Sequence, residues 1–358
     1  MAVRGAHFER ISDAINCALP TMKGFLIITI REAQAVDSQH PVPSSPSRLY
    51  SLILKLRPVE RGTLMPFSGE LVHGAWLNWI RGAAPDVATA LHDGNKRRLF
   101  TCSGLQFPLP SERMREAERE NTHMPLFPEK TYTVRVTLLM GELFPLFYHS
   151  LLHFNMSELG AKRPPFMQIG KQALLLDEVV SDPDDAAGWT DFTSFATLVE
   201  KAKTCTPGKT QLLKLDFASL TAFSRCDKKS RVYGNHYARL PLPQYVFPGL
   251  ARRWEELAPP ELAGVVQQAR IEEYIAADGI VIDDYNLRTH RVQFVQHPQR
   301  GFIGTCTYAL RGPDEATSEE SPLTVRQQLL MLAQLAFYCG VGYKTPMGMG
   351  QTRPLKVG

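Results

Sequence analysis

The pattern of apolar and polar positions becomes regular at Leu49, after a leader that ends in a proline- and serine-rich linker over residues 41–47. From Tyr50 to Arg57 the side chains alternate in character, which predicts a strand, because successive side chains of a strand point to opposite faces. Over residues 68–80 the spacing of the apolar residues changes to that of a helix face. These apolar residues are Leu71, Val72, Ala75, Trp76, Trp79 and Ile80.

The same patterns predict the remaining elements of the first half of the chain. A short helix is expected over 85–92 and a charged, solvated segment over 112–121. Strands are expected over 99–105, 132–140 and 171–180, and a further helix over 143–154. The order strand, helix, strand, strand, helix, strand is that of a ferredoxin-like domain.

The second half can be read in the same way, with one strand more. Strands are predicted over 211–219, 279–284, 288–296, 300–310 and 351–356, and helices over 244–257 and 322–339. The sequence therefore predicts an α+β protein with two tandem ferredoxin-like (RRM-like) β-α-β-β-α-β domains. We expect an N-terminal extension over 1–47, an N-terminal domain over 48–185 and a C-terminal domain over 205–358.

Length and charge agree with this organisation. The chain has 358 residues, of which 44% are hydrophobic, enough for two domains with a core each. The formal net charge is only +4, which by itself does not indicate nucleic-acid binding. The charges are unevenly distributed, however, since acidic residues gather in 177–191, 255–284 and 314–320 and basic residues in 201–239. A basic face is compatible with a nearly neutral total.

Several classes of protein are disfavoured. The six cysteines lie far apart with no C-x-x-C pair, which argues against a zinc knuckle and a disulfide framework. No stretch reaches the roughly 18 apolar residues that a membrane span needs, and the N-terminus does not have the pattern of a signal peptide. We therefore expect a cytoplasmic protein that uses no metal or other cofactor and does not bind membranes.

The most distinctive string follows the last predicted helix and reads Gly340-Val-Gly342-Tyr-Lys-Thr-Pro-Met-Gly348-Met-Gly350. Glycine accepts positive φ and lets another group approach the main chain closely. Lys344 and Arg353 add charge, and Tyr343 offers an aromatic face for a base. We predict that this loop contacts RNA phosphates. The alternative is that Gly340 caps the helix and the rest forms a tight turn.

This string resembles the hallmark of a known family, the repeat-processing endoribonucleases of CRISPR systems. They form the sixth CRISPR-associated (Cas) protein family, within the RAMP superfamily, and carry a loop G-h-G-x5-G-h-G in which h is apolar. Gly340-Val341-Gly342 and Gly348-Met349-Gly350 match this loop. The resemblance spans roughly 49–356, and its other matching segments are Ser51–Pro58, Pro66–Ala75, Leu91–Gly94, Phe100–Ser103, Leu220–Phe223, Leu240–Pro243 and Val246–Trp254.

The resemblance implies an endoribonuclease that binds CRISPR repeat RNA and cuts precursor transcripts to mature crRNA. It also implies metal-independent attack by the RNA's own 2′-hydroxyl, which leaves 2′,3′-cyclic phosphate and 5′-hydroxyl ends. Other Cas proteins of an effector complex are candidate partners, and we expect a monomer or weak homodimer. Two alternatives stay open: a non-catalytic crRNA-binding subunit of an effector complex, and a nucleotide-binding enzyme of other chemistry.

Internal attack needs a base, an acid and a cation near the phosphate, and histidine suits both proton transfers because its reference pKa is about 6.5. His73 is the first candidate, on the flank of the helix over 68–80 where it can face a groove. Many family members carry a functional histidine on this helix. The alternative is a histidine satisfied by a carbonyl group or water. His92, at the end of the helix predicted over 85–92, is the second catalytic candidate, and Tyr50, at the start of the first strand, is a candidate hydroxyl partner. The alternatives are a helix-end residue favoured by the helix dipole for His92 and a core aromatic for Tyr50.

A second basic segment follows the first strand of the second half. Basic residues interleaved with aromatic ones suit RNA, because charges meet phosphates and rings meet unstacked bases. The segment contains Arg225, Lys228, Lys229, Arg231, Tyr233, His236, Tyr237 and Arg239. The alternative is a solvated surface loop, which is also the interpretation of His290. Family analogy places Arg252 and Arg253, beside a core Trp254, near the RNA stem.

Overall fold

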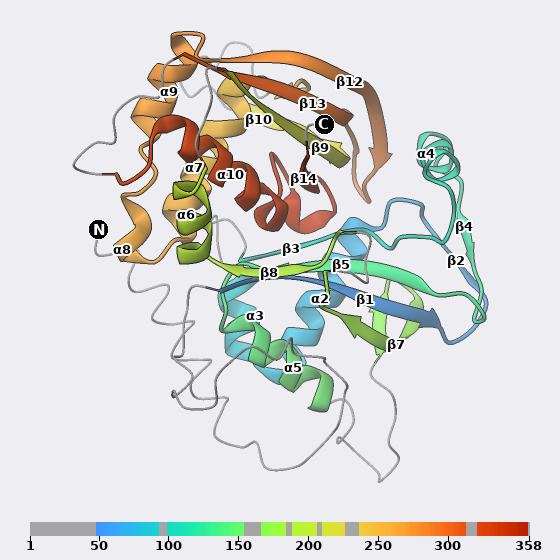
Figure 1. Cartoon of the computed structure of the whole chain (residues 1–358). Helices are drawn as coiled ribbons and strands as arrows, with labels where there is room; N and C mark the ends of the chain where they lie inside the picture. The colour runs from blue at the N-terminus through green and yellow to red at the C-terminus, as the bar shows by residue number, and fades with distance from the viewer. Residues whose placement is uncertain are drawn as a thin grey trace, which may run out of the picture. The chain divides into compact units, whose positions relative to one another are not determined.

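The computed structural model describes residues 48–92, 99–153, 166–183, 188–205, 210–225, 236–312 and 321–356. The chain divides into two compact units (Figure 1). The first unit comprises Met1–Ser111 and His123–Phe192, and the second comprises Glu112–Thr122 and Thr193–Gly358. The predicted extension over 1–47 lies outside the described residues.

The first unit is built on an antiparallel sheet with the strand order β3-β5-β1-β7-β6. These strands are β1 (Arg48–Pro58), β3 (Phe100–Cys102), β5 (Tyr132–Leu138), β6 (Phe166–Ile169) and β7 (Gln172–Val180). β8 (Asp191–Ser194) pairs with β1, and β2 (Gly62–Leu64) pairs with β4 (Met124–Leu126). The alternation read from the sequence holds in β1, where Leu52, Leu54 and Leu56 are buried.

Three helices lie on one face of this sheet: α2 (Gly69–Ala83), α3 (Pro85–His92) and α5 (Leu143–His153) (Figure 1). The apolar stripe of α2 accounts for its position, because Trp76 is fully buried and its ring lies 5.1 Å from that of Phe147 in α5. The Trp79 indole donates a hydrogen bond of 2.7 Å to the carbonyl oxygen of Phe166 on β6.

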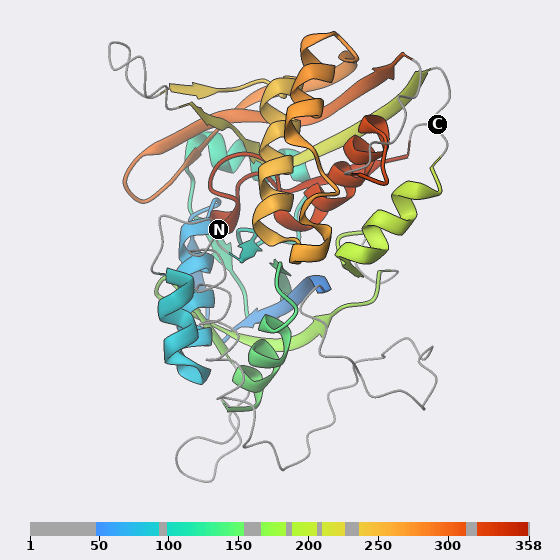
Figure 2. The same ribbon diagram turned by 90° about the vertical axis from the view of Figure 1, so that its left-hand side faces the viewer.

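The second unit has a four-stranded antiparallel sheet with the order β12-β13-β9-β14. Its strands are β9 (Thr210–Thr221), β12 (Ile280–Gln293), β13 (Pro298–Arg311) and β14 (Thr352–Leu355). Its helices include α6 (Phe195–Lys203), α7 (Pro243–Leu257), α8 (Pro260–Ala263), α9 (Gln268–Ala276) and α10 (Val325–Cys339). α7, α9 and α10 lie on one side of the sheet (Figure 2). β10 (Phe223–Arg225) and β11 (His236–Ala238) form a separate pair.

The two units share one topology. In each, the third strand of the β-α-β-β-α-β motif lies between the second and the first, and the fourth lies on the other side of the first. This arrangement gives β3-β5-β1-β7 in one unit and β12-β13-β9-β14 in the other. The prediction of an α+β protein with tandem ferredoxin-like domains is confirmed. No helix in the described ranges is long and apolar enough to cross a lipid bilayer.

The structure corrects the prediction for residues 112–121. This segment is a helix, α4 (Ser111–Glu120), whose residues from Glu112 onward belong to the second unit. The expected solvation holds, because Ala117 is its only buried residue, but this lack of an apolar stripe also hides the helix from the sequence pattern. Polar contacts, described below, take the place of apolar burial.

The predicted break between the strands over 279–284 and 288–296 is also wrong, since both are parts of one strand, β12. The residues between them are polar or exposed because β12 is at the edge of the sheet, and Tyr285 is 64% exposed. A register shift between Ile282 and Asp284 adds to the irregular pattern. Residues 186–204, between the predicted domains, contain β8 and α6.

Candidate nucleic-acid interface and catalytic residues

The glycine-rich loop connects α10 to β14 through a short 3-10 helix, η2 (Thr345–Met347). All four glycines have positive φ, between 68° at Gly340 and 89° at Gly342. A Cβ atom on Gly340 would lie 2.8 Å from the Gly350 carbonyl oxygen, and one on Gly342 would lie 2.5 Å from that of Ala222. A Cβ atom on Gly350 would collide with the Val341 carbonyl oxygen. The fold itself therefore requires glycine at these positions.

We expected these glycines to permit contact with RNA phosphates, but the structure shows that most of them are needed for packing within the protein. Gly340, Gly348 and Gly350 are buried, and Gly340 forms the C-cap of α10, as the alternative interpretation proposed. The amides of Val341 and Gly350 donate hydrogen bonds of 2.9 Å to the carbonyl oxygens of Gly350 and Leu220. Gly342 alone of the four is exposed. Contact between the main chain and an RNA phosphate stays a prediction. Among the four glycines, Gly342 is the best candidate for it because it is exposed.

Lys344 lies in the middle of the loop with aromatic rings around its ammonium group. The Nζ atom is 4.1 Å from the ring centroid of Phe294 and 5.5 Å from that of Tyr343. The Tyr343 ring in turn lies 5.3 Å from the Tyr237 ring of β11. We refer to Tyr237, Phe294, Tyr343 and Lys344 as the aromatic–lysine cluster.

This cluster joins two segments that the sequence marked separately, the glycine-rich loop and the basic segment that ends at Arg239. Phe294, which follows β12, was missed by sequence reasoning. It lies in a short stretch between two strands, where an apolar residue is indistinguishable from any other core position. Only the packing of the β12–β13 hairpin against the loop reveals its contact with Lys344.

The other predicted RNA-binding residues are dispersed. Arg353 Nε lies 3.1 Å from Asp216 Oδ2, and Arg253 is 6% exposed and donates a hydrogen bond of 3.1 Å to Glu256. Arg239 and Arg252 are exposed. These placements favour Arg239 and Arg252 over Arg253 as groups for RNA. The side chain of Arg225 and all of Lys228, Lys229 and Arg231 lie outside the described residues.

His73 is on α2, as predicted, but its ring is buried, with only 7% of the residue exposed. It stacks on Phe100 of β3, with 5.4 Å between ring centroids and 17° between planes. The expectation of a flank open to a groove is corrected, because residue 73 shares a helix face with Trp76 and Leu77, one turn later, and both are buried.

The other two catalytic candidates occupy different elements. Tyr50 is on β1, and its ring stacks on Phe144 of α5 at a centroid distance of 4.6 Å. His92 is the last residue of α3, and its side chain lies outside the described residues. The roles of His73, Tyr50 and His92 stay predictions.

Two of the described cysteines, Cys102 and Cys306, do not favour nucleophilic catalysis by a thiolate. Burial raises the pKa of Cys102, and it raises the pKa of Cys306 to about 11. Both thiols are therefore neutral near pH 7, and a neutral thiol is a poor nucleophile. Within the described residues there is no group of three or more His, Cys, Asp or Glu side chains suited to hold a metal ion.

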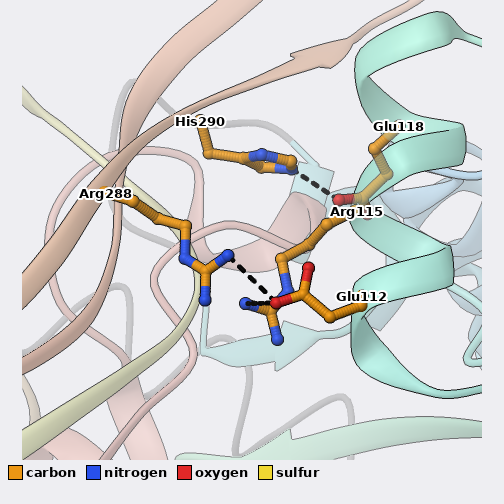
Figure 3. A network of polar contacts seen from close by, with 5 residues as sticks. All are labelled: Glu112, Arg115, Glu118, Arg288 and His290. Carbon is orange, nitrogen blue, oxygen red and sulfur yellow. Dashed lines mark hydrogen bonds and ion pairs between the residues drawn. The ribbon is translucent and has the colours of Figure 1, made fainter.

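A polar network joins α4 to β12 (Figure 3). The Glu118 carboxylate lies 2.6 Å from His290 Nε2, and the His290 side chain is 4% exposed. Arg288 donates a hydrogen bond of 3.2 Å to Glu112. The prediction of a surface loop at His290 is wrong, because His290 lies within β12 and is hydrogen-bonded to a carboxylate. The network therefore fastens α4 to the C-terminal sheet.

Comparison with known sequences identifies the family. The sequence pattern described as CRISPR Cas6 N-terminal domain matches residues 48–200. The pattern described as CRISPR-associated endoribonuclease Cas6 matches residues 215–352. Together the two patterns cover most of the chain. No curated protein matches it.

Solved structures of Cas6 proteins share this fold. The structure "Cas6 (TTHB231) product complex" is 24% identical, with a TM-score of 0.62 over 86% of this chain and 100% of that chain. "Thermus thermophilus Cas6 (TTHB231)" is 23% identical, with a TM-score of 0.56 over 87% of this chain and 100% of that chain. "Cas6 (TTHA0078) product complex" is 20% identical, with a TM-score of 0.54 over 86% and 100%. With both halves matched in sequence, the chain belongs to the CRISPR-associated endoribonuclease Cas6 family.

Proposed function

We propose that this protein binds CRISPR repeat RNA and cuts precursor transcripts to crRNA by attack of the RNA's own 2′-hydroxyl, without a metal ion. The products would carry 2′,3′-cyclic phosphate and 5′-hydroxyl ends. Endoribonuclease activity is the activity of the family. The observation that carries the proposal for RNA is the position of Lys344, held among aromatic rings inside the glycine-rich motif.

The proposed binding surface follows the groups that the structure leaves fully or partly exposed. Lys344, Arg239 and Arg252 supply positive charge, and Gly342 supplies exposed main chain. Phosphate contacts of this kind orient an RNA without reading its sequence. Arg225 at the end of β10 and Lys228, Lys229 and Arg231 after it in the sequence remain candidates.

For the chemical step, we propose that His73 moves a proton at one of the two reacting oxygens. Tyr50 and His92 are the candidates for the second proton transfer. Stacking on Phe100 fixes the plane of the His73 ring, which suits a group that must meet an oxygen in one orientation. A proton transfer by a positioned histidine contributes roughly 100- to 10,000-fold to a rate.

The His73→Gln and His73→Ala variants test this assignment. We expect the rate of repeat-RNA cleavage to fall about 100-fold or more, with the RNA dissociation constant within about threefold of wild type. His297→Ala is the matched control, because His297 is an exposed histidine in the turn after β12. Thermal melting verifies that each variant is folded. Undiminished cutting by the His73 variants, with binding intact, would show the catalytic assignment to be wrong.

Two substrate experiments test the mechanism. A 2′-deoxy sugar immediately upstream of the cut removes the proposed nucleophile, so cleavage should stop while binding stays nearly unchanged. Cleavage of the normal RNA should continue in the presence of a chelator. Cutting of the deoxy substrate would exclude internal attack, and loss of cutting in chelator would exclude metal independence.

A non-catalytic crRNA-binding subunit of an effector complex is the second candidate. The burial of His73 favours it, because a catalytic group must reach its substrate. In that case the wild-type protein would bind cognate repeat RNA tightly and leave it uncut, and other Cas proteins would be its partners.

A further inference from the structure

We infer that the aromatic–lysine cluster binds one unpaired nucleotide of the RNA, with its base stacked on Tyr237 and its phosphate beside Lys344. This inference rests on the proposed RNA binding and names the feature of the RNA that the second unit recognises. A base within a duplex has both faces covered by its neighbours, so a stacking site selects a nucleotide outside a stem.

The backbone of Lys344 is the first observation. Lys344 has φ 56° and ψ 36°, in the left-handed region. In the described parts of the chain, the other non-glycine residues with positive φ are Asn121 and Asp278. Asn and Asp stabilise this conformation through their short polar side chains, whereas lysine has no such compensation.

Four positions of the same loop with positive φ are glycine, so glycine at 344 would be the least strained choice. The chain instead has a lysine at a position where its backbone is strained. Such strain is a reason to look for a function of the side chain. The function indicated here is the placement of an ammonium group.

Phe294 is the second observation, because it determines where that ammonium group lies. The ring is 2% exposed and therefore fixed by its surroundings, and Lys344 Nζ is 4.1 Å from its centroid. An aromatic face attracts a cation but carries no net charge. It can therefore position the ammonium group without itself neutralising the charge.

Tyr237 is the third observation. It is 38% exposed, although it contacts the Tyr343 ring at 5.3 Å and 45°. Tyr343 is fixed by its amide, which donates a hydrogen bond of 2.9 Å to Ala222. Tyr343 thus supports a second ring that remains open to solvent. Because the Lys344 ammonium group lies 5.5 Å from the same Tyr343 ring, the cluster combines a cation with a supported, exposed ring. Proteins bind unstacked RNA bases with exposed aromatic rings and basic groups of this kind.

The test measures binding of repeat RNA to the full chain. Tyr237→Ala should weaken binding on the order of tenfold, as expected for the loss of one stacked base. Tyr237→Phe, which keeps the ring, should bind as wild type does. Tyr285→Ala is the matched control, because Tyr285 is an exposed tyrosine of the same unit outside the cluster. The Tyr285→Ala variant should bind repeat RNA as the wild type does.

Abasic substitution then identifies the nucleotide. Unpaired positions of the repeat RNA are made abasic one at a time and are titrated with wild type and Tyr237→Ala. At one position the abasic RNA should bind wild type as weakly as intact RNA binds the variant, and the two changes together should cost no more than either alone. Additive losses at every position, or an equal loss with Tyr285→Ala, would overturn the site.

Lys344→Gly tests the phosphate contact. Glycine relieves the backbone strain, so the melting temperature should not fall, while RNA affinity should drop several-fold. Unchanged affinity would overturn the contact. A cleavage assay on the wild-type protein distinguishes this inference from the proposed nuclease. If the protein binds repeat RNA but does not cut it, the proposed nuclease activity is contradicted, and the stacking site can still be tested by binding. If the wild-type protein binds no RNA, the proposed function and the stacking site are both overturned.

Discussion

The four glycines of the loop between α10 and β14 differ in what they do. Gly340 ends α10, Gly350 lies against Val341, and Gly342 is exposed next to Ala222. This motif of repeated glycines therefore combines a requirement of the fold with a proposed contact to RNA. Single substitutions separate these two contributions, because a buried glycine and an exposed glycine respond differently to an added side chain.

Gly350→Ala should destabilise the second unit by roughly 2–3 kcal/mol, because φ is +70° and the added Cβ atom would collide with the Val341 carbonyl oxygen. Denaturant unfolding measures the change. Gly249→Ala in α7 is the matched control, since a Cβ atom there has no neighbour within 4 Å. That variant should be neutral or stabilised by up to about 1 kcal/mol. Equal stability of the two variants would contradict the packing role of Gly350.

At the scale of elements, α4 lies between two strands of the first unit in the sequence but belongs to the second unit. Polar residues dominate it, and only Ala117 is buried. A helix of ten residues has marginal stability in water. Its contacts with β12, through Glu118 and His290 and through Glu112 and Arg288, are therefore expected to maintain it.

Glu118→Gln should loosen α4 and cost about 1–2 kcal/mol of unfolding free energy, because its partner His290 is buried. Hydrogen exchange at the α4 amides should become faster. Arg288→Ala should cost less than about 1 kcal/mol, since Arg288 and Glu112 are both largely exposed. If Arg288→Ala loosened α4 as much as Glu118→Gln, burial would not determine the strength of these contacts.

At the scale of the whole molecule, the positive charge available for RNA is small. The net charge is +4, and several basic side chains form ion pairs within the fold. These pairs are Lys55 with Glu178, Arg57 with Asp177, Arg288 with Glu112 and Arg353 with Asp216. RNA binding is therefore expected to depend on a few groups.

The salt dependence of RNA binding should reflect those few groups. The slope of log Kd against log salt concentration should fall by about 0.7–0.9 in Arg252→Gln if Arg252 contacts one phosphate. Arg57→Gln is the control, because Arg57 pairs with Asp177 and should leave the slope unchanged. Equal effects in the two variants would show that the exposed arginine of α7 does not contact RNA.

The order of strands and helices was largely predictable from the sequence. Alternation in β1 and helical spacing in α2 are local properties, and apolar burial produces both patterns. α4 and the continuity of β12 were not predictable in this way. One has ion pairs in place of an apolar face, and the other is an edge strand with exposed residues in its middle.

By itself, the sequence determined the tandem α+β topology, the glycine-rich motif and the helix that carries His73. These features depend on periodicity and spacing, which are local properties of the sequence. Tertiary structure alone decided that His73 is buried, that Arg353 is paired with Asp216, and that Tyr237 and Phe294 meet the loop at Tyr343 and Lys344. The physical reason is that these contacts join residues far apart in the sequence. Strand register and packing determine such contacts, and neither leaves a local signal.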